Sequence, residues 1–230
     1  MHPKILKKNL SKVRDRIQTA SRKAGREFND IKLLAVSKTK PPQSIRTLHQ
    51  FGVYAFGENY AQELAHKKSA LQELNLEWHF IGPIQSNKSR LIANNCDWVH
   101  SVDRIKVAEK LSKHRSPEKQ PLQVLLQVNI SRETSKSGVR PDDILELAEA
   151  VMLLPRLRLR GLMTIPSPSK ECITQRQAFA DLRNLQETLT NKIQCMDTLS
   201  MGMSEDFEAA ILEGSTIVRV GTHIFGSRYT

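Results

Sequence analysis

The sequence predicts an α/β fold in which strands and helices alternate about eight times and close into a single (β/α)8 barrel. Short apolar, β-rich segments alternate with amphipathic helical segments along the whole chain, which is typical of a parallel sheet with crossover helices. The chain has 230 residues, close to the ~250 that such a barrel needs. The Gly-rich fingerprint of an open dinucleotide-binding sheet is missing after the first strand, and no Pro/Gly-rich linker divides the chain. We therefore expect one barrel domain over residues 1–230.

The first predicted element is an extra helix that precedes the barrel. Apolar residues recur at helical spacing over residues 5–25, and Gly25 suits its end. Strands follow wherever short apolar runs stop at Gly, Pro or Asp, as at Gly82-Pro83, Asp103 and Pro166. The clearest run is LQVLLQVNI. The eight expected strands cover residues 31–36, 53–56, 78–81, 98–102, 122–130, 159–165, 198–203 and 217–220.

Helices are expected between these strands because the intervening segments carry apolar residues at helical spacing. Gly52 and Gly214 suit helix ends, and Pro141 with Asp142 suits a first helical turn. The seven expected helices cover residues 44–51, 61–74, 87–94, 105–114, 141–154, 175–193 and 205–213.

Composition places the chain among ordinary globular proteins, with 39% hydrophobic and 26% charged residues. The longest apolar runs are only long enough for strands, and the basic N-terminus has no apolar segment after it. We therefore expect a cytoplasmic protein. Cys96, Cys172 and Cys195 are far apart with no CxxC, which favours a reducing compartment and no cysteine metal site.

The net charge of +11 raises the possibility of nucleic-acid binding. The basic residues are spread along the chain, however, and aromatic residues make up only 5% of it, too few for a base-stacking platform. These features favour a solvated basic surface, or attraction for small anions such as phosphates. A basic adaptor that binds nucleic acid is the less favoured reading.

Lys38 is the residue around which a function can be built. It follows the apolar strand at residues 31–36 and is itself followed by Pro41-Pro42, so its amine is expected at the rim of the core. A lysine that loses solvation has a lowered pKa and becomes nucleophilic near neutral pH, as a Schiff base with an aldehyde requires. Taken alone, a solvated lysine at a strand end is the more common case.

The ends of the last two strands could form a phosphate site. In barrels of this kind, functional residues lie at the C-terminal ends of the strands, and a phosphate is often held after strands seven and eight. Met203 and Ser204 precede a predicted helix, and Gly221-Thr222 follow the last strand. Taken singly, each is more often an ordinary cap or turn residue.

Arg219 lies within the last strand, two residues before Gly221, so it should face the same way. An arginine inside a barrel needs a partner, and a ring nitrogen or a carboxylate is suitable. A salt bridge to Glu58 or to another acid is the structural alternative. A lysine, a phosphate site and a partner for a pyridine nitrogen together suit pyridoxal 5′-phosphate (PLP).

Seven segments of the chain resemble the pyridoxal phosphate homeostasis protein family, the YggS/PROSC type, which is itself similar to the barrel domain of alanine racemase. They occur in the family's order, and together they are highly specific although each is weak alone. Ile84 stands where the family often has Leu, a mild departure. The segments are LLAVSKTKP (33–41), FGENYAQE (56–63), WHFIGPIQSNK (78–88), SKSG (135–138), GLMTI (161–165), LSMGMSEDFEAAI (199–211) and VRVGTHIFGSR (218–228).

The resemblance implies a PLP-binding barrel and a set of site residues. Lys38 matches the family's Schiff-base lysine, and Arg219 matches the arginine that faces the pyridine nitrogen. Lys136 matches a lysine in a loop that is a possible second PLP contact. The phosphate contacts implied are Ser204, Gly221 and Thr222, and the pocket-lining residues implied are Asn59, His79, Met201 and Met203.

The residues favour a PLP carrier or regulator over an enzyme. Arginine can only donate to the pyridine nitrogen, which leaves that nitrogen unprotonated and makes PLP a weaker electron sink. Racemisation also needs a second base, and His79 inside a barrel is more often a hydrogen-bonded structural residue. We expect a monomer that buffers PLP and passes it to apo-enzymes, and the resemblance implies effects on vitamin B6 and amino-acid balance. The alternative is a PLP-dependent amino-acid racemase.

Overall fold

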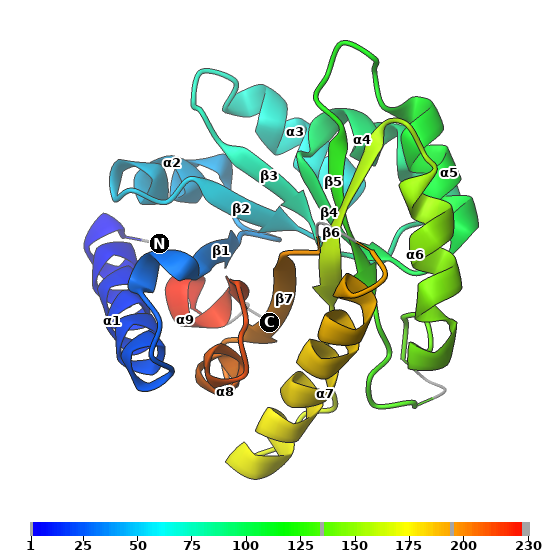
Figure 1. Ribbon diagram of the computed structural model, residues 1–230. Coiled ribbons are helices and arrows are strands. Elements are labelled where there is room, and N and C mark those ends of the chain that lie inside the picture. The colour runs from blue at the N-terminus through cyan, green and yellow to red at the C-terminus, as the bar shows by residue number, and fades with distance from the viewer. Residues whose placement is uncertain (1, 134–135, 194–195, 227–230) are drawn as a thin grey trace.

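Eight parallel strands form a closed barrel in the computed structural model, which describes residues 2–133, 136–193 and 196–226. Each strand pairs with the next along the chain, and β8 pairs with β1 to complete the circle. Helices surround the strands on the outside, as Figure 1 shows. The expected (β/α)8 barrel with an extra N-terminal helix is confirmed.

The strands lie close to the positions that the apolar runs predict. Three of them, β4, β7 and β8, match the sequence-based prediction at both ends. The strands are β1 (Lys32–Val36), β2 (Ala55–Glu58), β3 (Glu77–Phe80), β4 (Trp98–Val102), β5 (Leu122–Gln127), β6 (Leu157–Met163), β7 (Thr198–Met203) and β8 (Ile217–Val220).

The helices alternate with these strands, and short 3-10 turns precede α4 and α6. One four-residue helix, α9, was not predicted. The helices are α1 (Pro3–Lys23), α2 (Pro42–Gln50), α3 (Ala61–Ala70), α4 (Ser89–Asn95), α5 (Ile105–His114), α6 (Ile144–Met152), α7 (Cys172–Thr190), α8 (Phe207–Leu212) and α9 (Thr222–Phe225).

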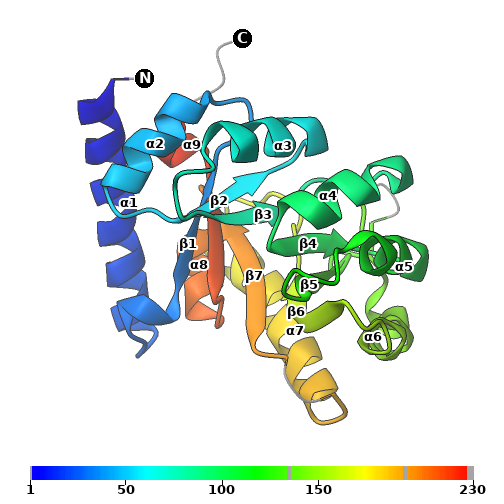
Figure 2. The ribbon, with the colours of Figure 1, turned by 90° about the horizontal axis from the view of Figure 1, so that it is seen from above.

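The N-terminal helix α1 covers the part of the barrel where the last helices are too short to do so. It packs against α8, α9 and α2 (Figures 1 and 2). Its buried stripe contains Leu6, Leu10, Val13 and Ile17, which recur at helical spacing. Because α8 and α9 are only 6 and 4 residues long, α1 supplies the outer layer beside β8 and β1.

Several predicted boundaries were wrong, and three of them show the size of the differences. The helix after β7 begins at Phe207 rather than Glu205, because the Asp206 carboxylate accepts a hydrogen bond from the Met203 N–H at 2.6 Å and holds a turn there. Strand β5 ends at Gln127, after which Val128 makes an isolated bridge to Val139. The helix expected over residues 61–74 ends at Ala70.

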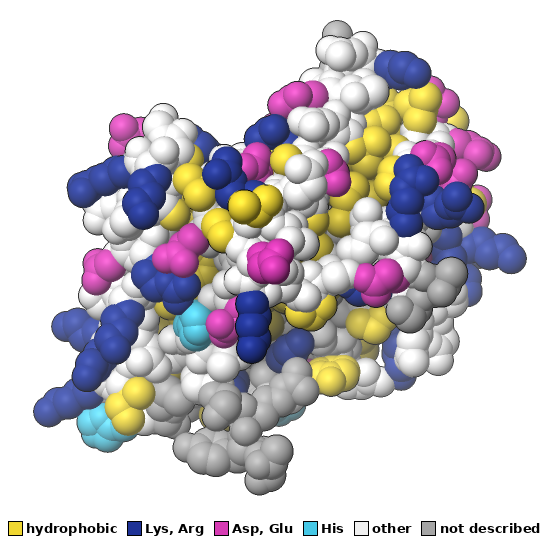
Figure 3. All heavy atoms as spheres, turned by 90° about the horizontal axis from the view of Figure 1, so that it is seen from below, with side chains coloured by type: hydrophobic (Ala, Val, Ile, Leu, Met, Phe, Trp, Pro, Cys, Tyr) yellow, Lys and Arg dark blue, Asp and Glu magenta, His cyan; other side chains and the backbone are white. Residues whose placement is uncertain are grey.

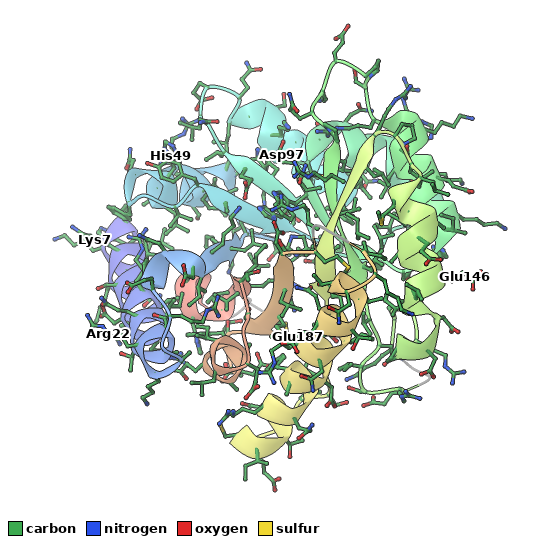
Figure 4. All side chains as sticks on the ribbon, viewed as in Figure 1. Lys7, Arg22, His49, Asp97, Glu146 and Glu187 are labelled. Atoms are coloured by element: carbon green, nitrogen blue, oxygen red, sulfur yellow. The ribbon has the colours of Figure 1, made fainter. Side chains whose placement is uncertain are left out.

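The surface carries charges of both signs in close proximity. On the face in Figure 3, lysine and arginine side chains alternate with carboxylates instead of forming one cationic field. The labelled Lys7 and Arg22 on α1 and Glu146 on α6 point away from the barrel in Figure 4. Charges of both signs are therefore interspersed on this face.

Membrane spanning and metal binding find no support in the described part of the chain. None of its helices has the length and apolar character needed to cross a membrane. The same residues contain no group of three or more His, Cys, Asp or Glu side chains placed to hold a metal ion. Cys96 is buried, which raises the pKa of its thiol to about 12, and Cys172 is exposed; Cys195 lies outside the described residues.

Gly161 offers a test of the barrel's packing. It has a φ of 151°, and a Cβ built on it would lie 1.9 Å from the Thr198 carbonyl oxygen on β7. Gly161→Ala is expected to lower the free energy of unfolding by about 3 kcal/mol or more, because β6 and β7 must separate. Urea denaturation would measure the loss.

Gly25 provides the matched control for that substitution. It also has a positive φ, of 66°, but a Cβ there would have no neighbour within 4 Å. Gly25→Ala should therefore cost only about 1 kcal/mol, the price of a left-handed conformation. Equal losses for the two variants would contradict the close approach of β6 and β7.

Candidate functional site

Lys38 lies in a turn directly after β1, at the C-terminal end of the barrel strands, and is half-buried. The next residue, Thr39, has a φ of 65°, a left-handed conformation that is unusual for a β-branched side chain. Such a conformation persists only when surrounding contacts hold it. The structure therefore fixes the backbone around Lys38.

The contacts that hold this turn come from α3. The Lys67 ammonium donates to the Ser37 carbonyl at 2.7 Å. The Glu63 carboxylate accepts from the Thr39 N–H, also at 2.7 Å. The residues on both sides of Lys38 are thus bonded to one helix, and we call Lys67 and Glu63 the α3 clamp.

The α3 clamp is part of a buried cluster of charges. The Lys67 side chain is only 2% exposed and forms 2.7 Å ion pairs with Glu58 and Glu63. The Ser37 hydroxyl donates to the same Glu58 oxygen at 2.5 Å. Burial raises the pKa of Glu58, although Lys67 and Ser37 oppose this effect. Glu58 Oε2 is buried without a hydrogen-bond partner, so the cluster depends strongly on the charge of Lys67.

Strand register brings the predicted phosphate residues next to Lys38. Ala35 pairs with Val220, and Met203 pairs with Arg219, so the ends of β1, β8 and β7 are neighbours. A Cβ built on Gly221 would lie 3.4 Å from both Cβ and O of Val36. Because parallel strands end on the same side of a barrel, Lys38, Gly221 and Ser204 occupy one rim.

Ser204 and Thr222 differ in exposure at this rim. Ser204 is buried within the turn that Met203 and Asp206 close, with a second bond from the Asp206 N–H to the Met203 carbonyl at 3.2 Å. Thr222 is exposed and begins α9, for which Gly221 is the N-cap. Two hydroxyls from separate loops therefore border the same strand ends.

Arg219 lies inside the barrel, and its partners are neutral groups. It is 3% exposed, and it donates to the Ser200 hydroxyl and to the Thr164 carbonyl, each at 2.8 Å. The expected alternative of a salt bridge to Glu58 was wrong, because Glu58 pairs with Lys67; within the described ranges no carboxylate forms a salt bridge with Arg219. Burial lowers the pKa of Arg219 to about 10, against the opposing charge of Asp206. The guanidinium therefore stays cationic at neutral pH.

His79 does not contact Arg219 directly. It is completely buried, and its ring bonds to His100 at 2.8 Å and to Glu77 at 2.6 Å. Two side chains, Ser200 and His100, separate it from Arg219. This hydrogen-bonded arrangement matches the structural role that the sequence favoured, and contact between His79 and a cofactor stays a prediction.

The remaining predicted residues lie at or near the same rim. Asn59 follows β2, and its Oδ1 is buried without a hydrogen-bond partner. Met201 is fully buried in β7, whereas Met203 is 37% exposed at its end. The Lys136 ammonium is 2.8 Å from the Ser167 hydroxyl, which ties the loop after β5 to the loop after β6. Ser135 of the family segment SKSG lies outside the described residues.

Sequence reasoning missed Ser200, His100 and Lys67. The two polar residues lie in the apolar strands β7 and β4, so an unexplained polar side chain was the available signal. Lys67 lies in α3 among other polar residues, and nothing in its neighbourhood distinguishes it from a solvated lysine.

Comparison with known proteins decides the family. The alanine racemase N-terminal domain family matches residues 9–229. A relative from Pseudomonas aeruginosa is 56% identical over 220 residues, covering 96% of this chain and 94% of its own length. One from Escherichia coli is 51% identical over 223 residues, covering 96% and 95%. Both are named pyridoxal phosphate homeostasis protein. The chain belongs to the pyridoxal phosphate homeostasis protein family.

Solved structures agree with the membership of this family. PipY of Synechococcus elongatus, in a structure with PLP bound, is 31% identical with a TM-score of 0.83, covering 96% of this chain and all of its own. A protein of unknown function from Bifidobacterium adolescentis is 36% identical with a TM-score of 0.91, covering 97% and 95%. Alanine racemase of Clostridium difficile, at 15% identity and a TM-score of 0.72, shares the fold; this chain covers 57% of it.

The buried cluster around the α3 clamp yields a prediction about stability. Lys67→Met removes the cation and leaves Glu58 charged in an apolar surrounding, so we expect a loss of about 3–5 kcal/mol in the free energy of unfolding at pH 7. The loss should shrink as the pH falls through the raised pKa of Glu58, because a protonated carboxyl needs no cation. Urea denaturation at several pH values would measure both effects.

The double variant Glu58→Gln/Lys67→Met is the control. With no buried charge left at residue 58, it should be more stable than Lys67→Met alone. Equal stability of the single and double variants would show that the pair is not coupled.

Proposed function

We propose that this protein binds PLP at the C-terminal mouth of its barrel, holds it as a Schiff base on Lys38, and keeps it available for apo-enzymes. The observation that carries the proposal is the shared rim on which Lys38, Ser204 and Gly221 meet, in a chain whose relative PipY has PLP bound in its structure. When bound, PLP supplies an aldehyde that condenses reversibly with amines.

The groups on this rim fit the chemistry of PLP. The Ser204 and Thr222 hydroxyls would bind the phosphate, and Gly221, which has no side chain, would let the phosphate approach the backbone. Arg219, a donor without an acid partner among the described residues, would face the pyridine nitrogen. Asn59 Oδ1 has no hydrogen-bond partner, so the end of this side chain is available for the ligand. Rotating the amide by half a turn would place its NH2 group there and offer a donor in place of an acceptor. Met201 and Met203 would line the pocket.

A carrier role agrees better with these residues than catalysis does. The Arg219 guanidinium keeps its proton at neutral pH, so it would leave the pyridine nitrogen unprotonated and limit the stabilisation of a carbanion. His79 is engaged by Glu77 and His100 and is not poised as a second base. The relatives named as homeostasis proteins support the same reading.

The proposal includes the cellular setting expected from the sequence. We propose that the protein acts in the cytoplasm as a monomer and that its partners are PLP-dependent apo-enzymes. Lys136, which the Ser167 hydroxyl holds near the loop after β6, would be a second contact for PLP. Supplying a stable pool of a reactive aldehyde would account for effects on vitamin B6 balance.

The role of Lys38 can be tested by trapping. Borohydride should fix PLP covalently on Lys38 in the wild type, and Lys38→Ala should lose both the trapped adduct and the yellow absorption band. Mass spectrometry of peptides would locate the adduct. Lys119→Ala is the control, because burial lowers the pKa of Lys119 but this residue bonds to the Asn94 carbonyl, away from the rim. Trapping that survives in Lys38→Ala would overturn the assignment.

The phosphate site can be tested by comparing PLP with pyridoxal, which lacks the phosphate. Ser204→Ala should weaken PLP binding by roughly 10-fold, the loss of about one charge-assisted hydrogen bond. Its effect on pyridoxal binding should be within about 2-fold, and titration by absorbance would measure both. Equal losses for the two ligands would place Ser204 away from the phosphate.

The carrier proposal and the racemase alternative predict different outcomes for the protein loaded with PLP. A carrier should transfer PLP to an apo-aminotransferase while leaving L-alanine and other L-amino acids unchanged. Turnover of an L-amino acid that disappears in Lys38→Ala would replace the carrier proposal with the racemase.

A further inference from the structure

A continuous chain of side-chain hydrogen bonds crosses the interior of the barrel from Arg219 to Glu77. Arg219 on β8 bonds to Ser200 on β7 at 2.8 Å, and Ser200 bonds to Nδ1 of His100 on β4 at 2.8 Å. His100 Nε2 lies 2.8 Å from His79 Nδ1 on β3, and His79 Nε2 lies 2.6 Å from Glu77 Oε1. In the closed strand order, the neighbouring strands β3 and β4 lie opposite the neighbouring strands β7 and β8, and the bonds link the two pairs. We call Ser200, His100 and His79 the relay.

When both imidazoles are neutral, the two ends of the relay allow only one direction for its hydrogen bonds. Arg219 can only donate, and an ionised Glu77 can only accept. Ser200 therefore accepts from Arg219 and donates to His100 Nδ1. His100 then donates from Nε2 to His79 Nδ1, and His79 donates from Nε2 to Glu77. Each neutral imidazole thereby carries its proton on Nε2.

The surroundings of the two rings agree with this assignment. Both histidines are completely buried, and burial lowers the pKa of each, so neither gains a second proton at neutral pH. The Trp98 ring stacks on His79 at 5.6 Å between centroids and with 8° between planes. The relay is thus held in one orientation by packing as well as by its bonds.

The outer end of the relay reaches the opposite mouth of the barrel. Glu77 begins β3, is 35% exposed in its side chain, and pairs with Lys32 at 2.6 Å. Both line a cavity of about 310 Å³ beneath the barrel, together with Arg14 and Tyr54. Burial alone would raise the pKa of Glu77, but hydrogen bonds from His79 and Lys32, together with the charge of Lys32, lower it. Glu77 therefore supplies a permanent negative charge at this end.

We propose that the relay positions the Arg219 guanidinium for the ring of the bound cofactor and transmits to it the charge of Glu77 at the far mouth. The aligned bonds present an oxygen lone pair to Arg219 and a donor proton to Glu77, so each end stabilises the charge at the other. The inference rests on the proposed binding of PLP. It makes Ser200, His100 and His79 positioning residues and makes Glu77 a remote determinant of the cofactor's electronic state.

Other charged side chains lie near the relay, so the variants used to test it must leave those charges unchanged. Lys32 on β1 lies 5.3 Å from the Trp98 ring centre, and Arg160 on β6 lies 5.1 Å from it. Asp97 precedes β4 and accepts from the Trp78 N–H at 2.9 Å. Asp206 acts on Arg219 from the rim. None of these is changed in the variants below.

The first measurement needs no cofactor. Nitrogen-15 NMR of the histidine rings in the PLP-free protein should show His79 and His100 as neutral Nε2–H tautomers between pH 6 and 8. His79→Gln and His100→Gln would assign the two signals. An Nδ1–H tautomer on either ring, or a charged ring in this range, would overturn the relay.

The second measurement uses the protein loaded with PLP labelled with nitrogen-15 in its ring. Ser200→Ala and Glu77→Gln should move the ring-nitrogen signal in the same direction and weaken PLP binding by roughly 3- to 10-fold, about the worth of one hydrogen bond. Ser200→Thr, which keeps the hydroxyl, should restore the wild-type signal. Thermal unfolding would establish that each variant is folded.

Glu73→Gln is the matched control for Glu77→Gln. Glu73 is an exposed carboxylate that precedes the same strand and pairs with a cation, Arg46, but it does not touch the relay. Its variant should leave the ring-nitrogen signal unchanged. If Ser200→Ala moves the signal and Glu77→Gln does not, Glu77 has no remote effect and the proposal fails while PLP binding stands. If the wild type binds no PLP, the proposed function itself fails.

Discussion

Charged groups that the fold buries must be paired with other polar groups, and the arrangement of the candidate site depends on this constraint. The clearest case is Lys67, whose ammonium is enclosed by Glu58, Glu63 and the Ser37 carbonyl. An unpaired charge in such a place would cost several kcal/mol. Because the same contacts bind the residues on both sides of Lys38, the requirement to pair a buried charge also fixes where the proposed Schiff-base lysine lies.

Arg219 meets the same constraint in a different way. It has neutral partners at Ser200 and Thr164, and the nearest charge that can balance it through bonds is Glu77, at the other mouth of the barrel. A guanidinium solvated by hydroxyl and carbonyl oxygens keeps its charge and its direction while leaving donor capacity for a ligand. A carboxylate in direct contact would compete with that ligand for the same donors.

In the proposed carrier role, these two arrangements would distinguish this chain from a catalyst on the same fold. Its family shares the barrel with alanine racemase, but likeness of fold does not carry activity. In the proposed carrier, a fixed amine, a phosphate site and a donor for the ring would hold PLP firmly without strengthening it as an electron sink. Binding and release would then be the functional steps, and the Lys136 contact with Ser167 lies between two loops that border the mouth.

The sequence by itself determined the alternation of strands and helices, the barrel, the family and the position of Lys38. These follow from local signals: periodic apolar residues, Gly and Pro at the ends of elements, and short segments such as LLAVSKTKP. Boundaries set by a single side-chain contact, such as the start of α8 after the Asp206 turn, were wrong by two residues because a contact across a turn has no periodicity.

Only the tertiary structure decided the partners of the buried polar groups. His100 and Ser200 are separated by 100 residues, yet they bond to each other inside the barrel. The sequence around Lys67 is that of an ordinary surface lysine, but in the folded barrel its side chain is buried against Glu58. The physical reason is that barrel closure brings together side chains from distant strands, and the pairing of charges and donors is settled only when water has been excluded from between them.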